Sequence, residues 1–263
     1  MRVPVRILVL GGTGEARVLA TRLAARPGVV VTLSLAGRTR DPAVPDCAVR
    51  IGGFGGAEGL ARALGAVDIL VDATHPFARH ISANAEAASS ATGTPLVTLE
   101  RPPWQAVPGD RWIRVGDMSA AAAALGAAPR RVFLAIGRQE AGAFRAAPGH
   151  AYLLRSVEPV APGDLPPGAE TLLARGPFPE AAERALLAER GIEILVAKNS
   201  GGAATYGKIA AARGLGLPVV LVDRAARPCA AATVEEVLAR LDHLTAPVIS
   251  PPRSTAPSAK RGV

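Results

Sequence analysis

The stretch Arg6-Ile-Leu-Val-Leu10-Gly11-Gly12-Thr13-Gly14-Glu15-Ala16 decides the fold class of this chain. A short, mainly apolar strand runs directly into a glycine-rich loop, and a helix is predicted from residue 15 to residue 25. Glycines let the backbone approach a pyrophosphate, whose charge is then met by the N-terminus of the following helix. The spacing is not the usual GxGxxG, because Ala16 comes two residues after Gly14. The stretch therefore predicts a strand–loop–helix unit that binds a dinucleotide or another phosphate, with a plain strand–helix turn as the alternative.

The alternation of strand and helix continues along the chain. Strands are predicted over residues 6–10, 29–35, 49–51, 69–72 and 96–99, and then over 112–115, 131–135, 151–156, 193–196 and 219–222. Helices are predicted over 15–25, 57–64, 78–92, 119–125, 179–189, 204–213 and 234–244. This rhythm is typical of mainly parallel sheets with helices on both faces.

A Pro-rich, aperiodic stretch at residues 101–110 indicates where the chain crosses between two domains. We therefore expect an α/β protein of two Rossmann-like domains, with mainly parallel sheets flanked by helices and a cleft between the domains. Residues 1–101 are the predicted cofactor-binding domain, residues 102–245 a second α/β domain that contributes to the substrate cleft, and residues 246–263 a disordered tail.

The end of the predicted second strand bears on which nucleotide binds. It reads Ser34-Leu35-Ala36-Gly37-Arg38-Thr39-Arg40 and lacks the Asp or Glu that NAD sites present to the ribose hydroxyls. Hydroxyl and guanidinium groups suit a 2′-phosphate instead. We therefore predict NADPH, with surface arginines at a strand end as the alternative. The predicted contacts in these two stretches are Gly11, Gly12, Thr13, Gly14, Glu15, Ser34, Arg38, Thr39 and Arg40.

Two loops that follow strands in the first half are expected to line the cleft. In Gly52-Gly53-Phe54-Gly55-Gly56 the glycines suggest close backbone approach to a flat ring, either nicotinamide or substrate; a flexible turn is the alternative. In the stretch from Asp72 to Ala78, Thr74 can hydrogen bond and His75 can titrate near neutrality. The alternative is that Asp72 and Thr74 cap the next helix and that His75 is structural.

The stretch Lys198-Asn199-Ser200-Gly201-Gly202 ends a second-half strand and leads into a helix. It could hold a carboxylate by the Lys198 ammonium, the Ser200 hydroxyl and the helix N-terminus, or it could be an ordinary strand–helix connection. Thr205 lies one turn further on, and Arg138 follows another strand at the same edge.

Composition limits the classes of partner. The 263 residues carry a formal charge of +8, with a pI near 10.6, which indicates either a generally basic surface or an anionic small substrate. The arginines are spread out, which disfavours nucleic acid. Two cysteines and four histidines without ligand spacing disfavour a metal site. No signal peptide or membrane span is recognisable, so a cytoplasmic protein is expected; a monomer is compatible, but the sequence does not fix the oligomeric state.

Three of these motifs together resemble the precorrin-6A reductase family: the glycine loop at residues 11–16, Asp-Ala-Thr-His-Pro-Phe-Ala at 72–78, and Lys-Asn-Ser-Gly-Gly at 198–202. The resemblance spans about residues 5 to 245, and the second motif is the most specific. It implies NADPH-dependent reduction of the corrinoid macrocycle precorrin-6A to precorrin-6B in cobalamin biosynthesis. A homologous reductase acts on cobalt-precorrin-6A, and the motifs leave this alternative open.

The resemblance implies a polycarboxylate tetrapyrrole substrate, and the positive net charge of the chain would attract such an anion. Hydride passes from NADPH to a conjugated carbon and a proton completes the reduction. His75 is the candidate proton donor, and water is an equally acceptable one. Further cofactor contacts are predicted at Gly53, Phe54 and Thr74, and substrate contacts at His75, Phe77, Arg138, Lys198, Asn199, Ser200, Gly201 and Thr205.

Two other functional classes make different predictions for the sequence. A short-chain dehydrogenase needs a YxxxK pair, but Ser156 and Ala210 stand four residues after Tyr152 and Tyr206. A non-enzymatic NADPH-sensing module would bind the cofactor without consuming it, and the polar loop at residues 198–202 argues weakly against that interpretation.

Overall fold

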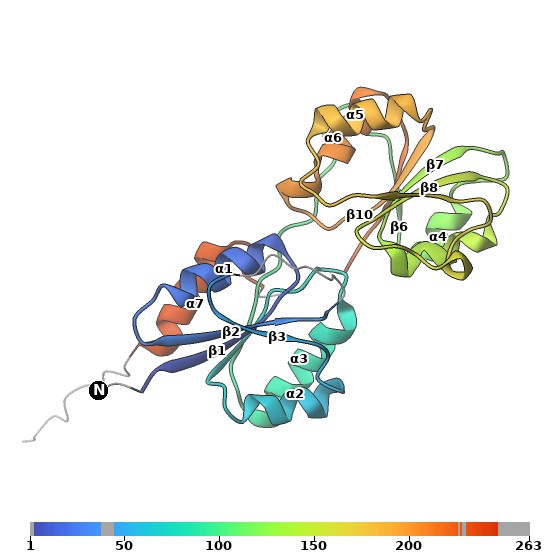
Figure 1. The fold of residues 1–263 in the computed structure, drawn as a ribbon. Helices are drawn as coiled ribbons and strands as arrows, with labels where there is room; N and C mark the ends of the chain where they lie inside the picture. Colours follow the sequence, from blue (N-terminus) through green and yellow to red (C-terminus); the bar gives the residue numbers. More distant parts are fainter. Residues whose placement is uncertain (1–2, 38–44, 226, 228–229, 247–263) are drawn as a thin grey trace, which may run out of the picture.

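The computed structural model describes residues 3–37, 45–225, 227 and 230–246, which form two α/β units (Figure 1). The first unit holds a five-stranded sheet in the order β3-β2-β1-β4-β5, and every registered pair in it is parallel. Its strands are β1 (Val5–Leu10), β2 (Val29–Leu35), β3 (Ala48–Ile51), β4 (Ile69–Asp72) and β5 (Leu96–Thr98). The expected α/β class with parallel sheets is confirmed.

Helices cover both faces of this sheet because the central strand is apolar on both sides. Along β1, Ile7 and Val9 are buried in one cluster with α1 (Gly14–Ala24), whereas Leu8 and Leu10 are buried in a second cluster with α2 (Gly56–Leu64) and α3 (Arg79–Thr92). Continuous apolar runs of this kind are typical of parallel strands buried on both faces.

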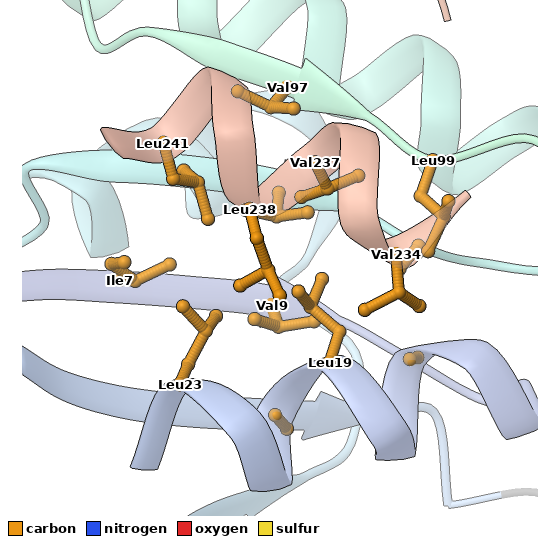
Figure 2. Packing of buried hydrophobic residues seen from close by; sticks show 14 of the residues in the cluster. Ile7, Val9, Leu19, Leu23, Val97, Leu99, Val234, Val237, Leu238 and Leu241 are labelled. Atoms are coloured by element: carbon orange, nitrogen blue, oxygen red, sulfur yellow. The ribbon is translucent and has the colours of Figure 1, made fainter. Parts of the chain in front are cut away.

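The last helix, α7 (Val234–Thr245), also belongs to the first unit (Figure 1). Its buried residues recur at helical spacing and pack against α1, β1 and the end of β5 (Figure 2). The expected division at residue 101 placed this helix in the second domain; the structure instead packs its apolar stripe on the first sheet. These residues are Val234, Val237, Leu238 and Leu241, packed beside Leu19, Leu23, Val97 and Leu99.

The second unit holds a six-stranded parallel sheet in the order β6-β11-β10-β7-β8-β9. Its strands are β6 (Trp112–Val115), β7 (Arg131–Ala135), β8 (Ala151–Ser156), β9 (Glu170–Leu173), β10 (Ile194–Lys198) and β11 (Val219–Val222). Its helices are α4 (Met118–Ala123), α5 (Glu180–Glu189) and α6 (Gly207–Gly214), with 3₁₀ turns η1 (Arg138–Ala146), η2 (Pro162–Asp164) and η3 (Ala203–Thr205). Strand β9 was not predicted, because it is a mostly exposed edge strand without an apolar run.

The chain crosses between the units twice. It leaves the first unit after β5 and returns after β11 (Figure 1), and the two crossing segments pair at a parallel bridge between Leu99 and Ala231. Two backbone hydrogen bonds support this pairing, Ala231 N to Thr98 O at 2.8 Å and Glu100 N to Ala231 O at 2.8 Å. The expected tail falls almost entirely outside the described residues. Within the part that is described, no helix combines the length and the apolar character that spanning a membrane requires.

Candidate functional site

The first sheet has its switch point between β1 and β4, because the chain continues from β1 towards one edge and later returns to place β4 on the other side. Ligands of open α/β sheets bind at the carboxyl ends of the strands at such a point. Here the Thr13 hydroxyl donates to the carbonyl of Ala73 at 2.9 Å, so the two loops lie side by side. The same oxygen accepts from Ala16 N at 3.0 Å and caps helix α1.

The glycine loop lies close against β2 and leaves its amide donors free. A Cβ at Gly11 would lie 2.6 Å from the Leu33 side chain, and Gly12 has a φ of +117° with nothing close to it. Within the described part of the chain, no hydrogen bond uses the N–H groups of residues 12–15. These are the donors that a helix N-terminus offers to an anion. The loop therefore has the geometry that the sequence predicted for it.

The stretch after β4 is organised by a buried carboxylate. Asp72 is 2% exposed and accepts from Thr74 N at 3.1 Å and from the Thr74 hydroxyl at 2.6 Å. Its other oxygen accepts from Arg227 at 2.9 Å. Neither Asp72 nor Thr74 caps the next helix, since α3 begins at Arg79 with no side-chain cap. The alternative of helix capping is therefore wrong. Asp72 instead shapes the turn that carries His75 and Phe77.

The second sheet has a switch point of its own, between β7 and β10. Lys198 at the end of β10 pairs across it with Glu140 of η1, Nζ to Oε1 at 2.7 Å. The Lys198 ammonium also lies 5.5 Å from the centroid of the Phe77 ring, and Phe77 packs against the core of the second unit. The carboxyl edges of the two sheets therefore meet here, and the expected substrate cleft between the units stays a prediction.

His75 is buried near several positively charged side chains where the two sheets meet. Its Nδ1 accepts from Phe77 N at 3.2 Å, so a neutral ring carries its proton on Nε2. Burial lowers the pKa of His75 to about 3, aided by the positive charges of Lys198, Arg101, Arg224 and Lys208. The imidazole is therefore neutral near pH 7 and does not supply a proton as imidazolium unless anions offset those cations. Its role as proton donor stays a prediction.

The depressed pKa of His75 makes stability depend on pH. The folded protein binds fewer protons at this group than the unfolded chain between pH 6.5 and about 3, so this contribution to stability is lost as the pH falls through that window. We expect His75→Asn, which keeps an acceptor for Phe77 N, to lose less stability than wild type from neutral pH to about pH 4. Urea unfolding of both proteins at several pH values measures this difference. Parallel pH profiles would contradict the assignment.

The loop at residues 198–202 is bound tightly to the first crossing segment. Asn199 is 1% exposed; its Oδ1 accepts from Trp104 N at 2.7 Å and its Nδ2 donates to Trp104 O at 3.3 Å and to Asp223 at 3.1 Å. Gly201 and Gly202 have φ values of +67° and +81° and lie against Arg101 and Pro102. Asn199 and Gly201 therefore hold the crossing segment, and ligand contact from either stays a prediction without geometric support.

Arg101 connects the two units directly. Its Nε donates to the carbonyls of Ser200 at 2.8 Å and Gly201 at 3.1 Å, and its Nη1 pairs with Glu15 of the glycine loop at 2.7 Å. It lines a small pocket at the first switch point together with Thr13, Glu15, Ala73, Thr74, Pro76 and Leu99. Sequence reasoning missed Arg101 as a site residue, although its place directly after the fifth predicted strand was a usable signal.

Arg224 and Arg227 of the returning segment were also missed. Both pair with Glu100, and Arg224 bonds the backbone of Arg101 and Asn199 as well. Arginine residues that follow the last strand of a second unit are easily read as surface charge, and only the double crossing places them beside the site.

The end of β2, where contacts to a 2′-phosphate are predicted, is only partly described. Ser34 is buried at the end of β2, whereas Arg38, Thr39 and Arg40 lie outside the described residues. Arg50, on the neighbouring strand β3, was not predicted; it donates to the carbonyls of Gly52 and Gly53 at 2.6 Å each and lies 3.8 Å from the centroid of the Phe54 ring. The glycine-rich turn is thus ordered by an arginine and is not merely flexible.

Two predicted substrate contacts lie at the second switch point. Arg138 is exposed at the start of η1, directly after β7, and Thr205 lies at the end of η3 with its carbonyl accepting from Lys208 Nζ at 2.7 Å. Their contact with a ligand stays a prediction.

Known proteins resemble this chain in sequence and in fold. A family model described as precorrin-6x reductase CbiJ/CobK matches residues 6–242. The chain belongs to this family. A precorrin-6A reductase of Sinorhizobium sp is 55% identical over 92% of this chain and 94% of its own length, and one of Rhodobacter capsulatus is 51% identical over 92% and 98%. A solved structure titled CobK precorrin-6A reductase superimposes with a TM-score of 0.87 at 49% identity, over 92% of this chain and 98% of that chain.

As a precorrin-6x reductase, the chain is an oxidoreductase, which is consistent with a nicotinamide cofactor. The resemblance found in the three sequence motifs is confirmed by the family match. Membership also removes the short-chain dehydrogenase class from consideration.

Proposed function

We propose that this protein reduces precorrin-6A to precorrin-6B with NADPH in cobalamin biosynthesis. The observation that carries the proposal is the meeting of two sheet switch points, one with a glycine loop and the other with Lys198. A dinucleotide fits the first, because no described residue accepts from the amide donors of residues 12–15 and Gly12 leaves space beside the loop. A polycarboxylate fits the second, because Lys198 ends β10 there and Arg138 is exposed at the start of η1, after β7.

When bound, the cofactor supplies a hydride for a conjugated carbon of the macrocycle. The residues of the chain bind and orient the two partners. Thr13 fixes the glycine loop to the turn after β4, and that turn presents His75 and Phe77 towards the second unit. Carboxylates of a bound macrocycle would offset the charge of Lys198, raise the pKa of His75 and favour the protonated ring. His75 and water therefore both remain candidates for the proton.

The preference for NADPH over NADH follows from the end of β2, where no acidic side chain stands between Ser34 and Arg40. The relatives that are 55% and 51% identical to this chain are named precorrin-6A reductases, and this favours the metal-free substrate over cobalt-precorrin-6A. Cytoplasmic action follows from the expected biosynthetic role.

The experiment is spectrophotometric oxidation of NADPH by the purified protein with and without precorrin-6A. We expect consumption only with the macrocycle, and at least about a tenfold weaker response to NADH, the size of one charge-assisted hydrogen bond. Turnover on cobalt-precorrin-6A alone would replace the substrate by its cobalt form. NADPH binding without turnover on either macrocycle would favour the sensing module.

A further inference from the structure

We propose that Arg101, which follows the last strand of the first unit, binds the pyrophosphate of the cofactor directly. The inference rests on the proposed function, since it assigns a further binding residue to the same dinucleotide. Arg101 lines the small pocket at the first switch point, beside Thr13 and Glu15, where the free amide donors of the glycine loop lie.

The Arg101 guanidinium has one nitrogen whose hydrogen-bond donors are not used by the described residues. Its Nε is engaged by the Ser200 and Gly201 carbonyls and its Nη1 by Glu15. Its Nη2 donates no hydrogen bond to any residue that the structure describes. The side chain is 16% exposed, so the guanidinium is held in place without being fully enclosed. A planar guanidinium with two edges fixed and one nitrogen open suits a phosphate oxygen.

Charge at the loop gives the second reason. Glu15 is a predicted cofactor contact, but it stands in the first turn of α1, where its carboxylate would repel a pyrophosphate bound at the helix N-terminus, so we no longer expect it to bind the cofactor itself. Arg101 neutralises that carboxylate at 2.7 Å and brings a positive charge from the crossing segment. The other three cations around His75 have partners elsewhere. Arg224 pairs with Glu100 and Lys198 pairs with Glu140. The ammonium of the buried Lys208 donates to the carbonyl of Thr205. Arg101 alone among these four contacts the glycine loop in the described structure.

An ion-pair role and a phosphate-binding role make opposite predictions for two variants. If Arg101 serves only to pair with Glu15, then Arg101→Gln and Glu15→Gln break the same contact and should have the same effect. If Arg101 binds the pyrophosphate, Arg101→Gln loses a ligand, whereas Glu15→Gln removes a repelling carboxylate and frees the guanidinium. Gln at position 101 keeps an amide donor for the Ser200 and Gly201 carbonyls, so the crossing segment keeps part of its support.

The test is the dissociation constant of NADPH, measured by fluorescence, for wild type, Arg101→Gln and Glu15→Gln, with adenosine 2′-phosphate as a second probe. That probe has no pyrophosphate and reports only the adenosine end of the site. We expect Arg101→Gln to weaken NADPH binding by about tenfold or more. We expect Glu15→Gln to bind NADPH as tightly as wild type or tighter, and all three proteins to bind adenosine 2′-phosphate alike.

Equal losses in both variants, or a parallel loss of adenosine 2′-phosphate binding in Arg101→Gln, would overturn the proposal, as would NADPH affinity unchanged in that variant. Arg101→Ala carries the same prediction if Arg101→Gln does not fold. Failure of the proposed function looks different: wild type would then not oxidise NADPH with either macrocycle, whatever the order of the variants.

Discussion

Gly201→Ala is expected to lower the free energy of unfolding by about 3 kcal/mol or more and to remove most reductase activity. Two costs act together. The residue has a φ of +67°, which side chains other than glycine rarely adopt, and a Cβ there would overlap the carbonyl oxygen of Pro102. Because that oxygen is backbone, the loop at residues 198–202 or the crossing segment must move. Either movement displaces Arg101 and Lys198 from the cleft.

Gly216→Ala is the matched control. Gly216 has the same φ of +67°, but an added Cβ meets nothing within 4 Å. It should cost only the conformational term, about 1–2 kcal/mol, and leave turnover close to wild type. Urea unfolding and NADPH oxidation of the two variants separate the strain from the clash. If both variants lose the same stability, the close approach of Pro102 carries no cost and the account of this loop is wrong.

Glu183→Ala is expected to destabilise the protein by about 3–5 kcal/mol. Glu183 and Arg155 form a bidentate pair inside the second unit, with side chains 3% and 7% exposed and Nη2 to Oε2 at 2.9 Å. The Arg155 guanidinium also lies 3.6 Å from the centroid of the Phe178 ring. Burial already lowers the pKa of Lys208 to about 7, with Arg155 contributing, while Glu183 acts in the opposite direction. Without Glu183, two buried cations lose their counter-charge.

The double variant Arg155→Met with Glu183→Leu tests the same idea from the other side. It removes both charges and fills the space with apolar side chains, so we expect a stability within about 1–2 kcal/mol of wild type. Chemical unfolding at pH 7 of the single and double variants gives the comparison. A double variant as unstable as Glu183→Ala would mean that the pair's geometry, and not the uncompensated charge, is what the unit needs.

Local patterns in the sequence predicted most of the elements, because strands buried on both faces are continuous apolar runs and helices carry apolar stripes. The strand from Val5 to Leu10 and the glycine loop after it follow in this way. The pattern of α7 predicts a helix with one apolar face, yet nothing in that pattern says which of two sheets it covers. Strand β9 carries no apolar run at all, since it is an exposed edge that pairs with β8 by backbone bonds.

The candidate site was predictable where a motif stands at the end of a strand. Lys198, Phe77 and His75 come together because parallel strands end at one edge of each sheet and the two edges meet. The burial of Asn199 against Trp104, and the pairing of Arg101 with Glu15, depend on the path of the crossing segments. That path is a property of the assembled chain and has no signature in any short stretch.

The double crossing has a consequence for how the protein is made. The second unit is an insertion within the first, because β1 to β5 precede it and α7 follows it. During synthesis the strands of the first sheet leave the ribosome early, but the helix that covers Val9 and Leu19 leaves only after the whole second unit. The inserted unit is therefore complete while its host still exposes an apolar face, which reverses the N-terminal-first order of most multidomain chains. The first unit is therefore the last part of the described chain to become whole.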